Sequence, residues 1–160
     1  MWFFMILSYI LIALSGIGLA LIGINHYFHF IPQNHITLDL LVSLIFVAGQ
    51  TLVIFFFVGT GVNIKEYIKN EKTENSFYSQ ILAVKRRLYP PTMMLLILFV
   101  AMVIVDGVFF IRKVSDFWFG GLYVLTLYYY IKATLVQHKS FQQSTEIILN
   151  MTGVKAEEKM

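Results

Sequence analysis

Four long apolar runs, separated by polar joints, constrain this chain more than any other feature of its sequence. A helix needs about 20 mostly apolar residues to cross about 30 Å of hydrocarbon. Residues 1–25, 40–62, 93–111 and 117–136 each meet that requirement. A membrane β-barrel is a poor alternative, because its strands alternate apolar and polar residues and it needs more of them than this chain can supply. The runs predict an all-α integral membrane protein, a bundle of four transmembrane helices.

The composition leads to the same class of protein. Of the 160 residues, 58% are hydrophobic and 13% are charged, whereas a soluble domain carries about 25% charged residues. Too few polar side chains are present to cover a water-soluble body of this size, so lipid must cover part of it. We expect residues 1–136 to form one transmembrane domain and residues 137–160 to form a polar cytoplasmic tail.

The basic residues predict the orientation of the chain in the membrane. Of the 12 Lys and Arg residues, all but Arg112 and Lys113 lie in the joint 63–92 or from Lys132 onward. Cytoplasmic loops carry an excess of Lys and Arg, and an even number of crossings places both termini on one side. We therefore predict cytoplasmic (or matrix) termini, in a bacterial cytoplasmic membrane or a mitochondrial inner membrane. Because orientation explains the basic residues, we expect no nucleic-acid partner.

The joint between the second and third runs contains a candidate surface helix. Over residues 75–88, apolar side chains gather near one face with Lys85, Arg86 and Arg87 beside them. This pattern is typical of a short amphipathic helix lying on the inner membrane surface, and a solvated loop is the alternative. The three basic side chains are expected to face anionic lipid or a partner protein.

Small residues within the apolar runs indicate where helices approach one another. Lipid tails are as apolar as leucine, so close contact at small side chains drives much of the association between helices. We expect these residues to pack within the bundle or to dock a partner subunit. The candidates are Gly16 and Ala20, which form a small-xxx-small pair, together with Gly49, Gly120 and Gly121.

Polar residues at membrane depth are functional candidates because their burial is costly. Asp106 is the one acidic residue well inside a predicted helix. Its carboxyl group could relay a proton, bind a cation, pair with Arg112 or Lys113, or hold helices together. Gln50 and Thr51, near the middle of the second helix, are expected to bridge helices by hydrogen bonds or to share a polar pathway with Asp106.

Three histidines cluster in the joint after the first helix, on the side opposite the termini. His26 and His29 share a face if that helix continues past residue 25, and the chain then turns so that His35 can fold back toward them. Three imidazoles can bind copper or zinc, and one can ligate the iron of haem b. The alternative is an interfacial or hydrogen-bonded role.

The sequence predicts no enzymatic chemistry. Cysteine is absent, which excludes thiol redox catalysis, Cys-ligated zinc and iron–sulfur clusters. No nucleotide-binding, metalloprotease or serine-hydrolase motif occurs. The leading interpretation is a non-catalytic subunit that packs in and stabilises a larger membrane complex, with lipids and other membrane proteins as partners. The alternatives are a metal or haem protein built on His26, His29 and His35, serving electron transfer or metal handling, and a small transporter or proton-pathway protein built on Asp106.

Overall fold

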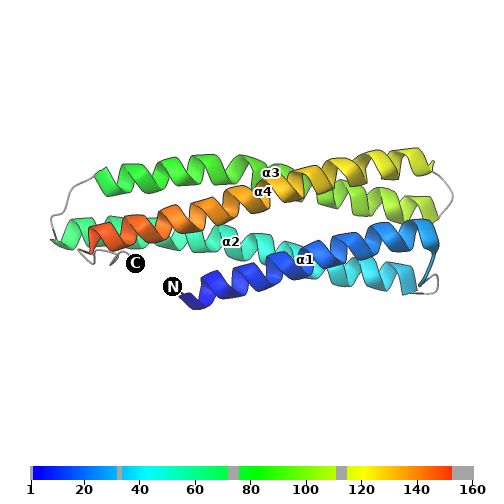
Figure 1. Cartoon of the computed structure of the whole chain (residues 1–160), viewed down its shortest axis with the longest axis horizontal. Coiled ribbons are helices and arrows are strands. Elements are labelled where there is room, and N and C mark those ends of the chain that lie inside the picture. Colours follow the sequence, from blue (N-terminus) through cyan, green and yellow to red (C-terminus); the bar gives the residue numbers. More distant parts are fainter. Residues whose placement is uncertain (1, 32–33, 72–75, 111–114, 153–160) are drawn as a thin grey trace, which may run out of the picture.

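The computed structural model describes residues 2–31, 34–71, 76–110 and 115–152, and these form four α-helices (Figure 1). In chain order the helices are α1 (Trp2–Phe28), α2 (His35–Glu71), α3 (Ser76–Phe110) and α4 (Asp116–Met151). The described residues contain no strand. The predicted all-α class is therefore confirmed.

Consecutive helices run antiparallel, in an up-down-up-down bundle (Figure 1). The end of the bundle at which α1 leads to α2 and α3 leads to α4 is called the distal end below. The start of α1 and the end of α4 lie away from it. α1 packs mainly on α2 and α3 mainly on α4, while contacts between α2 and α3 join the two pairs. Residues near positions 28, 35, 110 and 116 are thereby brought together at the distal end.

Three helices are long and apolar enough to cross a membrane. The candidate spans within the described residues are Phe3–Phe28, His35–Asn70 and Ser76–Val108. These spans support a multi-pass membrane protein. The crossing by α4 remains a prediction, although its distal half does expose the large apolar side chains that lipid requires: Phe117, Trp118, Val124, Leu125, Tyr128, Ile131 and Leu135.

The helices extend well beyond the apolar runs that predicted them. α2 begins at His35 rather than near residue 40 and ends at Glu71 rather than near residue 62. Its 37 residues correspond to about 55 Å at 1.5 Å per residue, more than the hydrocarbon thickness. Hydropathy marks the part of a helix that lipid covers, whereas backbone hydrogen bonding continues as long as one face is buried.

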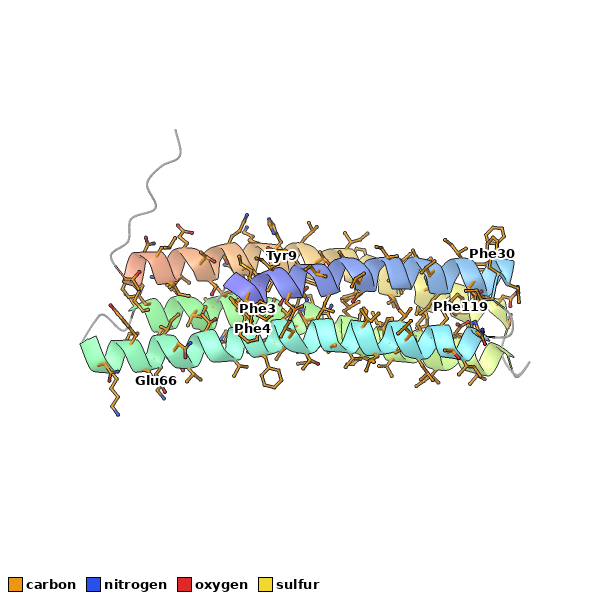
Figure 2. All side chains as sticks on the ribbon, turned by 90° about the horizontal axis from the view of Figure 1, so that it is seen from below. Phe3, Phe4, Tyr9, Phe30, Glu66 and Phe119 are labelled. Atoms are coloured by element: carbon orange, nitrogen blue, oxygen red, sulfur yellow. The ribbon has the colours of Figure 1, made fainter. Side chains whose placement is uncertain are left out.

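The extra length of α2, α3 and α4 forms a three-helix extension at the end away from the distal end. α1 begins part of the way along the bundle, at Phe3 and Phe4, whereas Glu66 of α2 lies farther out (Figure 2). Residues 76–88 of the expected surface helix form the first part of α3, and residues 137–151 of the expected tail belong to α4. Residue 75 and residues 153–160 lie outside the described part. Apolar side chains form a continuous core there, including Ile64, Ile68, Ile81, Val84, Leu88, Phe141 and Ile147.

The small residues divide into packed and exposed positions. A Cβ atom at Gly16 would come within 2.7 Å of the Tyr130 hydroxyl, one at Gly49 within 3.2 Å of Leu11, and one at Gly120 within 2.9 Å of the Tyr27 hydroxyl. Gly16 and Gly49 thus lie at tightly packed positions, whereas the Tyr27 hydroxyl at Gly120 is the end of an exposed side chain that can move aside. Ala20 and Gly121 differ from expectation, because both are exposed. Ala20 is rotated away from the surface that Gly16 presents to α4, so the two do not form one interface.

Candidate metal centre

Titratable side chains from three helices meet inside the distal end of the bundle. His26 comes from α1, His35 and Asp39 come from α2, and Asp106 comes from α3. Each of the four is at most 5% exposed. A buried charge is costly unless it is paired, hydrogen-bonded or bound to a metal, so the side chains of this cluster must satisfy one another or a ligand.

His26 connects the cluster to α1 and α4. Its Nδ1 lies 2.5 Å from Oδ1 of Asp106, and its ring stacks on Phe119 of α4, with ring centroids 3.6 Å apart and planes inclined by 12°. The stacking fixes the plane of the imidazole, and the hydrogen bond fixes one oxygen of the Asp106 carboxyl group. The second oxygen of Asp106, Oδ2, is thereby directed to the other members of the cluster.

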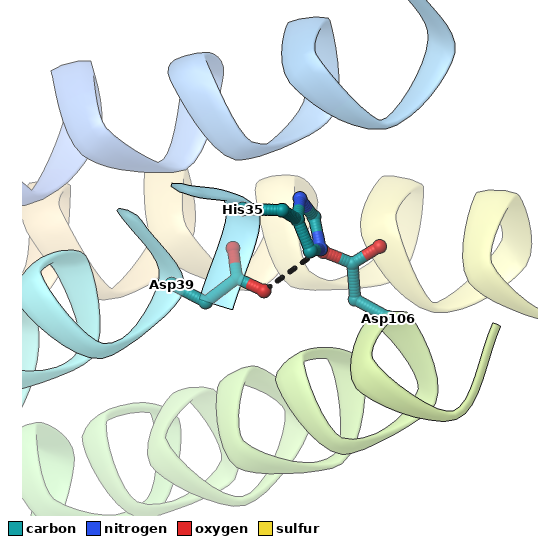
Figure 3. A group of neighbouring side chains, drawn as sticks. All are labelled: His35, Asp39 and Asp106. Atoms are coloured by element: carbon teal, nitrogen blue, oxygen red, sulfur yellow. Dashed lines mark ion pairs between the residues drawn. The ribbon is translucent and has the colours of Figure 1, made fainter. Parts of the chain in front are cut away.

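His35, Asp39 and Asp106 form the centre of the cluster (Figure 3). Nε2 of His35 lies 3.0 Å from Oδ2 of Asp39 and 3.0 Å from Oδ2 of Asp106. His35 and Asp39 are one helical turn apart, so α2 presents both on the same face. One ligand atom from each of the three residues lies within 4.8 Å of the other two.

These separations suit a shared metal ion. Two ligand atoms bonded at about 2.1 Å to one metal lie about 3.0 Å apart at a right angle and about 3.4 Å apart at the tetrahedral angle. The donor set is one imidazole and two carboxylates, which fits Zn²⁺, Mn²⁺ or Fe²⁺ better than soft Cu(I). Oδ2 of Asp106, which lies 3.0 Å from Nε2 of His35, is buried and accepts no hydrogen bond from any described residue. A cation held by the three residues would satisfy that oxygen.

Asn25 closes the cluster on the side of the connection between α1 and α2. Its side-chain Nδ2 lies 2.8 Å from Nδ1 of His35, and its Oδ1 accepts a hydrogen bond of 2.8 Å from the backbone N–H of Ile31. Asn25 itself is buried. One amide therefore holds both the His35 ring and the chain that leads into α2.

The structure places two of the three predicted histidines, His26 and His35, in this cluster. His29 is exposed at the end of α1, and its φ of 52° lies in the left-handed region, so its side chain leaves the face that carries His26. Asp39 was not predicted, because the apolar run suggested a helix starting near residue 40. Extending that helix back to His35 reveals the i, i+4 pair. Arg112 and Lys113, the expected partners of Asp106, lie outside the described residues.

Gln50 takes part in a second buried polar group, deeper in the bundle. Nε2 of Gln137, on α4, donates hydrogen bonds to Oε1 of Gln50 at 2.7 Å and to Oγ1 of Thr92, on α3, at 3.2 Å. Between this group and the His/Asp cluster, Phe46 and Phe99 stack with centroids 3.8 Å apart. Thr51 differs from expectation, because it is exposed and points away from Gln50.

The three basic side chains near the start of α3 differ in exposure. Lys85 is half-buried, in contact range of Gly61 on α2, whereas Arg86 and Arg87 are exposed. Arg86 and Arg87 are therefore the two of the three that are accessible to anionic lipid or to a partner. They lie on α3, far along the bundle from the His/Asp cluster.

Comparisons with models of protein families, with curated proteins and with solved structures gave no match.

Proposed function

We propose that this protein is a multi-pass membrane protein that binds a divalent transition-metal ion at its distal end, through His35, Asp39 and Asp106. The observation that carries the proposal is the convergence of one imidazole and two carboxylates, all buried, with 3.0 Å between the imidazole nitrogen and each carboxylate. A cluster of acids inside an apolar bundle is stabilised when a cation offsets the carboxylate charge.

The number of ligands favours metal handling over a purely structural role. Closed structural zinc sites use four protein ligands, whereas sites with three protein ligands keep a position for water or another molecule. Three residues form the candidate group within the described part of the chain. The expected metal is therefore exchangeable. His26 acts as an outer partner, because its hydrogen bond orients Asp106, as second-shell residues do around metal ligands.

The site lies close to the distal end of the bundle. Asp106 is about one turn from the end of α3, and His35 is the first residue of α2. With the termini on the Lys- and Arg-rich side, as proposed from the sequence, the distal end faces the periplasm or its equivalent. Metal ions would then enter from the non-cytoplasmic side. Membership of a larger membrane complex remains a further prediction and is compatible with this role.

Calorimetric titration of the purified protein in lipid nanodiscs with Zn²⁺, and separately with Mn²⁺, tests the proposal. We expect saturable binding of one ion per chain. Asp106→Asn and His35→Ala should each weaken binding by more than about 100-fold, since loss of an outer partner alone costs about 10–100-fold. Circular dichroism of each variant checks that the helices are retained.

His29→Asn is the matched control. Asparagine tolerates the left-handed backbone that His29 adopts, and His29 lies outside the proposed ligand set. Affinity should be unchanged in this variant. The absence of saturable binding to the unaltered chain, or equal affinity in Asp106→Asn and the unaltered chain, would overturn the proposal. A loss in His29→Asn with Asp106→Asn unaffected would instead support the histidine triad expected from the sequence.

A further inference from the structure

The hydrogen bonds of Asn25 determine which nitrogen of His35 carries a proton. The backbone N–H of Ile31 can only donate, so the Asn25 atom that faces it must be the carbonyl oxygen, Oδ1. The amide NH₂ then faces Nδ1 of His35 at 2.8 Å and must donate to it. Nδ1 is therefore an acceptor without a proton. The proton of the neutral ring sits on Nε2, the nitrogen that lies between Asp39 and Asp106.

This tautomer is suited to a metal-free cluster and unsuited to metal binding. An Nε2–H group 3.0 Å from an oxygen of each carboxylate group attracts both oxygens electrostatically. A metal ion needs the Nε2 lone pair instead, so the proton must be on Nδ1. That Nδ1–H would point at the NH₂ group of Asn25, placing two donors against each other. Metal ligation by His35 is thus incompatible with the present orientation of the Asn25 amide.

We propose that Asn25 is a positioning residue that couples metal binding to the connection between α1 and α2. This inference rests on the proposed metal site. When a metal ion binds, His35 loses the Nε2 proton to water and takes one from water at Nδ1, so the ring is neutral before and after. The Asn25 amide turns so that Oδ1 accepts from Nδ1–H. Its NH₂ then faces the Ile31 N–H, and the hydrogen bond that holds Ile31 is lost.

The position of Asn25 makes the coupling direct. Asn25 is 3% exposed, so its amide rather than bulk water is the hydrogen-bond partner of both groups. The same amide that fixes the His35 tautomer also anchors the first residues after α1, which include the exposed Phe30 (Figure 2). Metal binding at the cluster should therefore alter the backbone at Ile31, on the distal surface of the protein.

Asn25→Asp separates this role from simple packing. A carboxylate accepts from both the Ile31 N–H and a His35 Nδ1–H, so the metal-ready tautomer is favoured with no reorientation. Asn25→Leu is the control of similar volume that removes both hydrogen bonds. We expect Asn25→Asp to bind Zn²⁺ about 10-fold more tightly than the unaltered chain, and Asn25→Leu to bind about 10-fold less tightly.

The decisive measurements are made on the full chain in nanodiscs, with and without saturating Zn²⁺. Nitrogen-15 NMR of the histidine rings should place the His35 proton on Nε2 without Zn²⁺ and on Nδ1 with it. Hydrogen exchange at the Ile31 amide should accelerate about 10-fold on Zn²⁺ binding in the unaltered chain, and should not change in Asn25→Asp. The tautomer measurement uses the unaltered chain, so it tests the predicted proton shift of His35 even if a variant fails to fold.

The outcomes distinguish this inference from the metal site on which it rests. Tight Zn²⁺ binding with an unchanged Ile31 exchange rate, or with Asn25→Asp no tighter than the unaltered chain, overturns the role of Asn25 and leaves the metal site standing. No saturable Zn²⁺ binding by the unaltered chain overturns both.

Discussion

Replacing Gln137 with leucine should destabilise the bundle by about 2–4 kcal/mol. The change keeps the side-chain volume but removes two hydrogen bonds, at 2.7 Å to Gln50 and at 3.2 Å to Thr92, which together tie α4 to α2 and α3. Hydrogen bonds between membrane helices contribute about 0.6 kcal/mol each on average. The Gln50 amide, which is 1% exposed, would also lose its partner, and an orphaned buried polar group costs about 1–3 kcal/mol.

The assay is reversible unfolding in mixed micelles with increasing SDS, followed by circular dichroism. Thr51→Val is the matched control, because Thr51 neighbours Gln50 in sequence but is exposed; its effect should stay within about 0.5 kcal/mol. The double variant Gln50→Leu, Gln137→Leu should be less destabilised than the sum of the two single variants, by about 1 kcal/mol, because no orphaned amide remains. If Gln137→Leu costs no more than Thr51→Val, the inferred bridge between the three helices is refuted.

Three further predictions address packing, topology and lipid contact. Gly23→Ala should destabilise the bundle by about 1–3 kcal/mol in the same assay, because the added Cβ would overlap the Tyr123 ring. Gly121→Ala is the control: no atom lies near its added Cβ, so it should be neutral or stabilising by up to about 1 kcal/mol. Equal effects of the two changes would contradict the packing described. Because the chain has no cysteine, Phe30→Cys and Glu66→Cys can be labelled singly with a membrane-impermeant reagent in oriented vesicles. They should react from opposite sides, and labelling from one side would rule out the bundle orientation. Arg86→Gln combined with Arg87→Gln should weaken retention of anionic lipid, measured by native mass spectrometry, by about 1 kcal/mol per charge; unchanged retention would assign these residues another role.

The sequence was sufficient to predict the class of the fold and several of its chemical groups. Four apolar runs predicted the four helices in the correct order. The spacing of the histidines drew attention to His26 and His35, and the cost of burying a polar group drew attention to Asp106. These inferences succeed because hydropathy and burial cost are properties of a residue and its immediate neighbours. The helix ends were less predictable, since the parts of α2 and α3 beyond the apolar runs carry charged residues on their outer faces while their inner faces pack together.

The composition of the site could not be predicted in the same way. Asp39 and Asn25 lie at the edges of apolar runs, and the sequence did not single them out as site residues. His29 and Thr51 were predicted as site residues on the same grounds as their neighbours His26 and Gln50. His26 faces the interior of the bundle, whereas His29 is exposed because the backbone leaves α1 in the left-handed region there. Thr51 is exposed because it lies on the outer face of α2. Rotation of a helix about its axis is set by side chains on the neighbouring helices, such as Phe119 against His26.

The sequence by itself thus determined that this chain enters a membrane as apolar helices, because about 20 consecutive apolar residues have no better environment than lipid. Only the tertiary structure decided that residues 26, 35, 39 and 106 meet at one point. Helix lengths and antiparallel pairing bring positions distant in the sequence to the same depth, and packing selects which faces meet there. The proposed metal site is therefore a property of the assembled bundle rather than of any single segment.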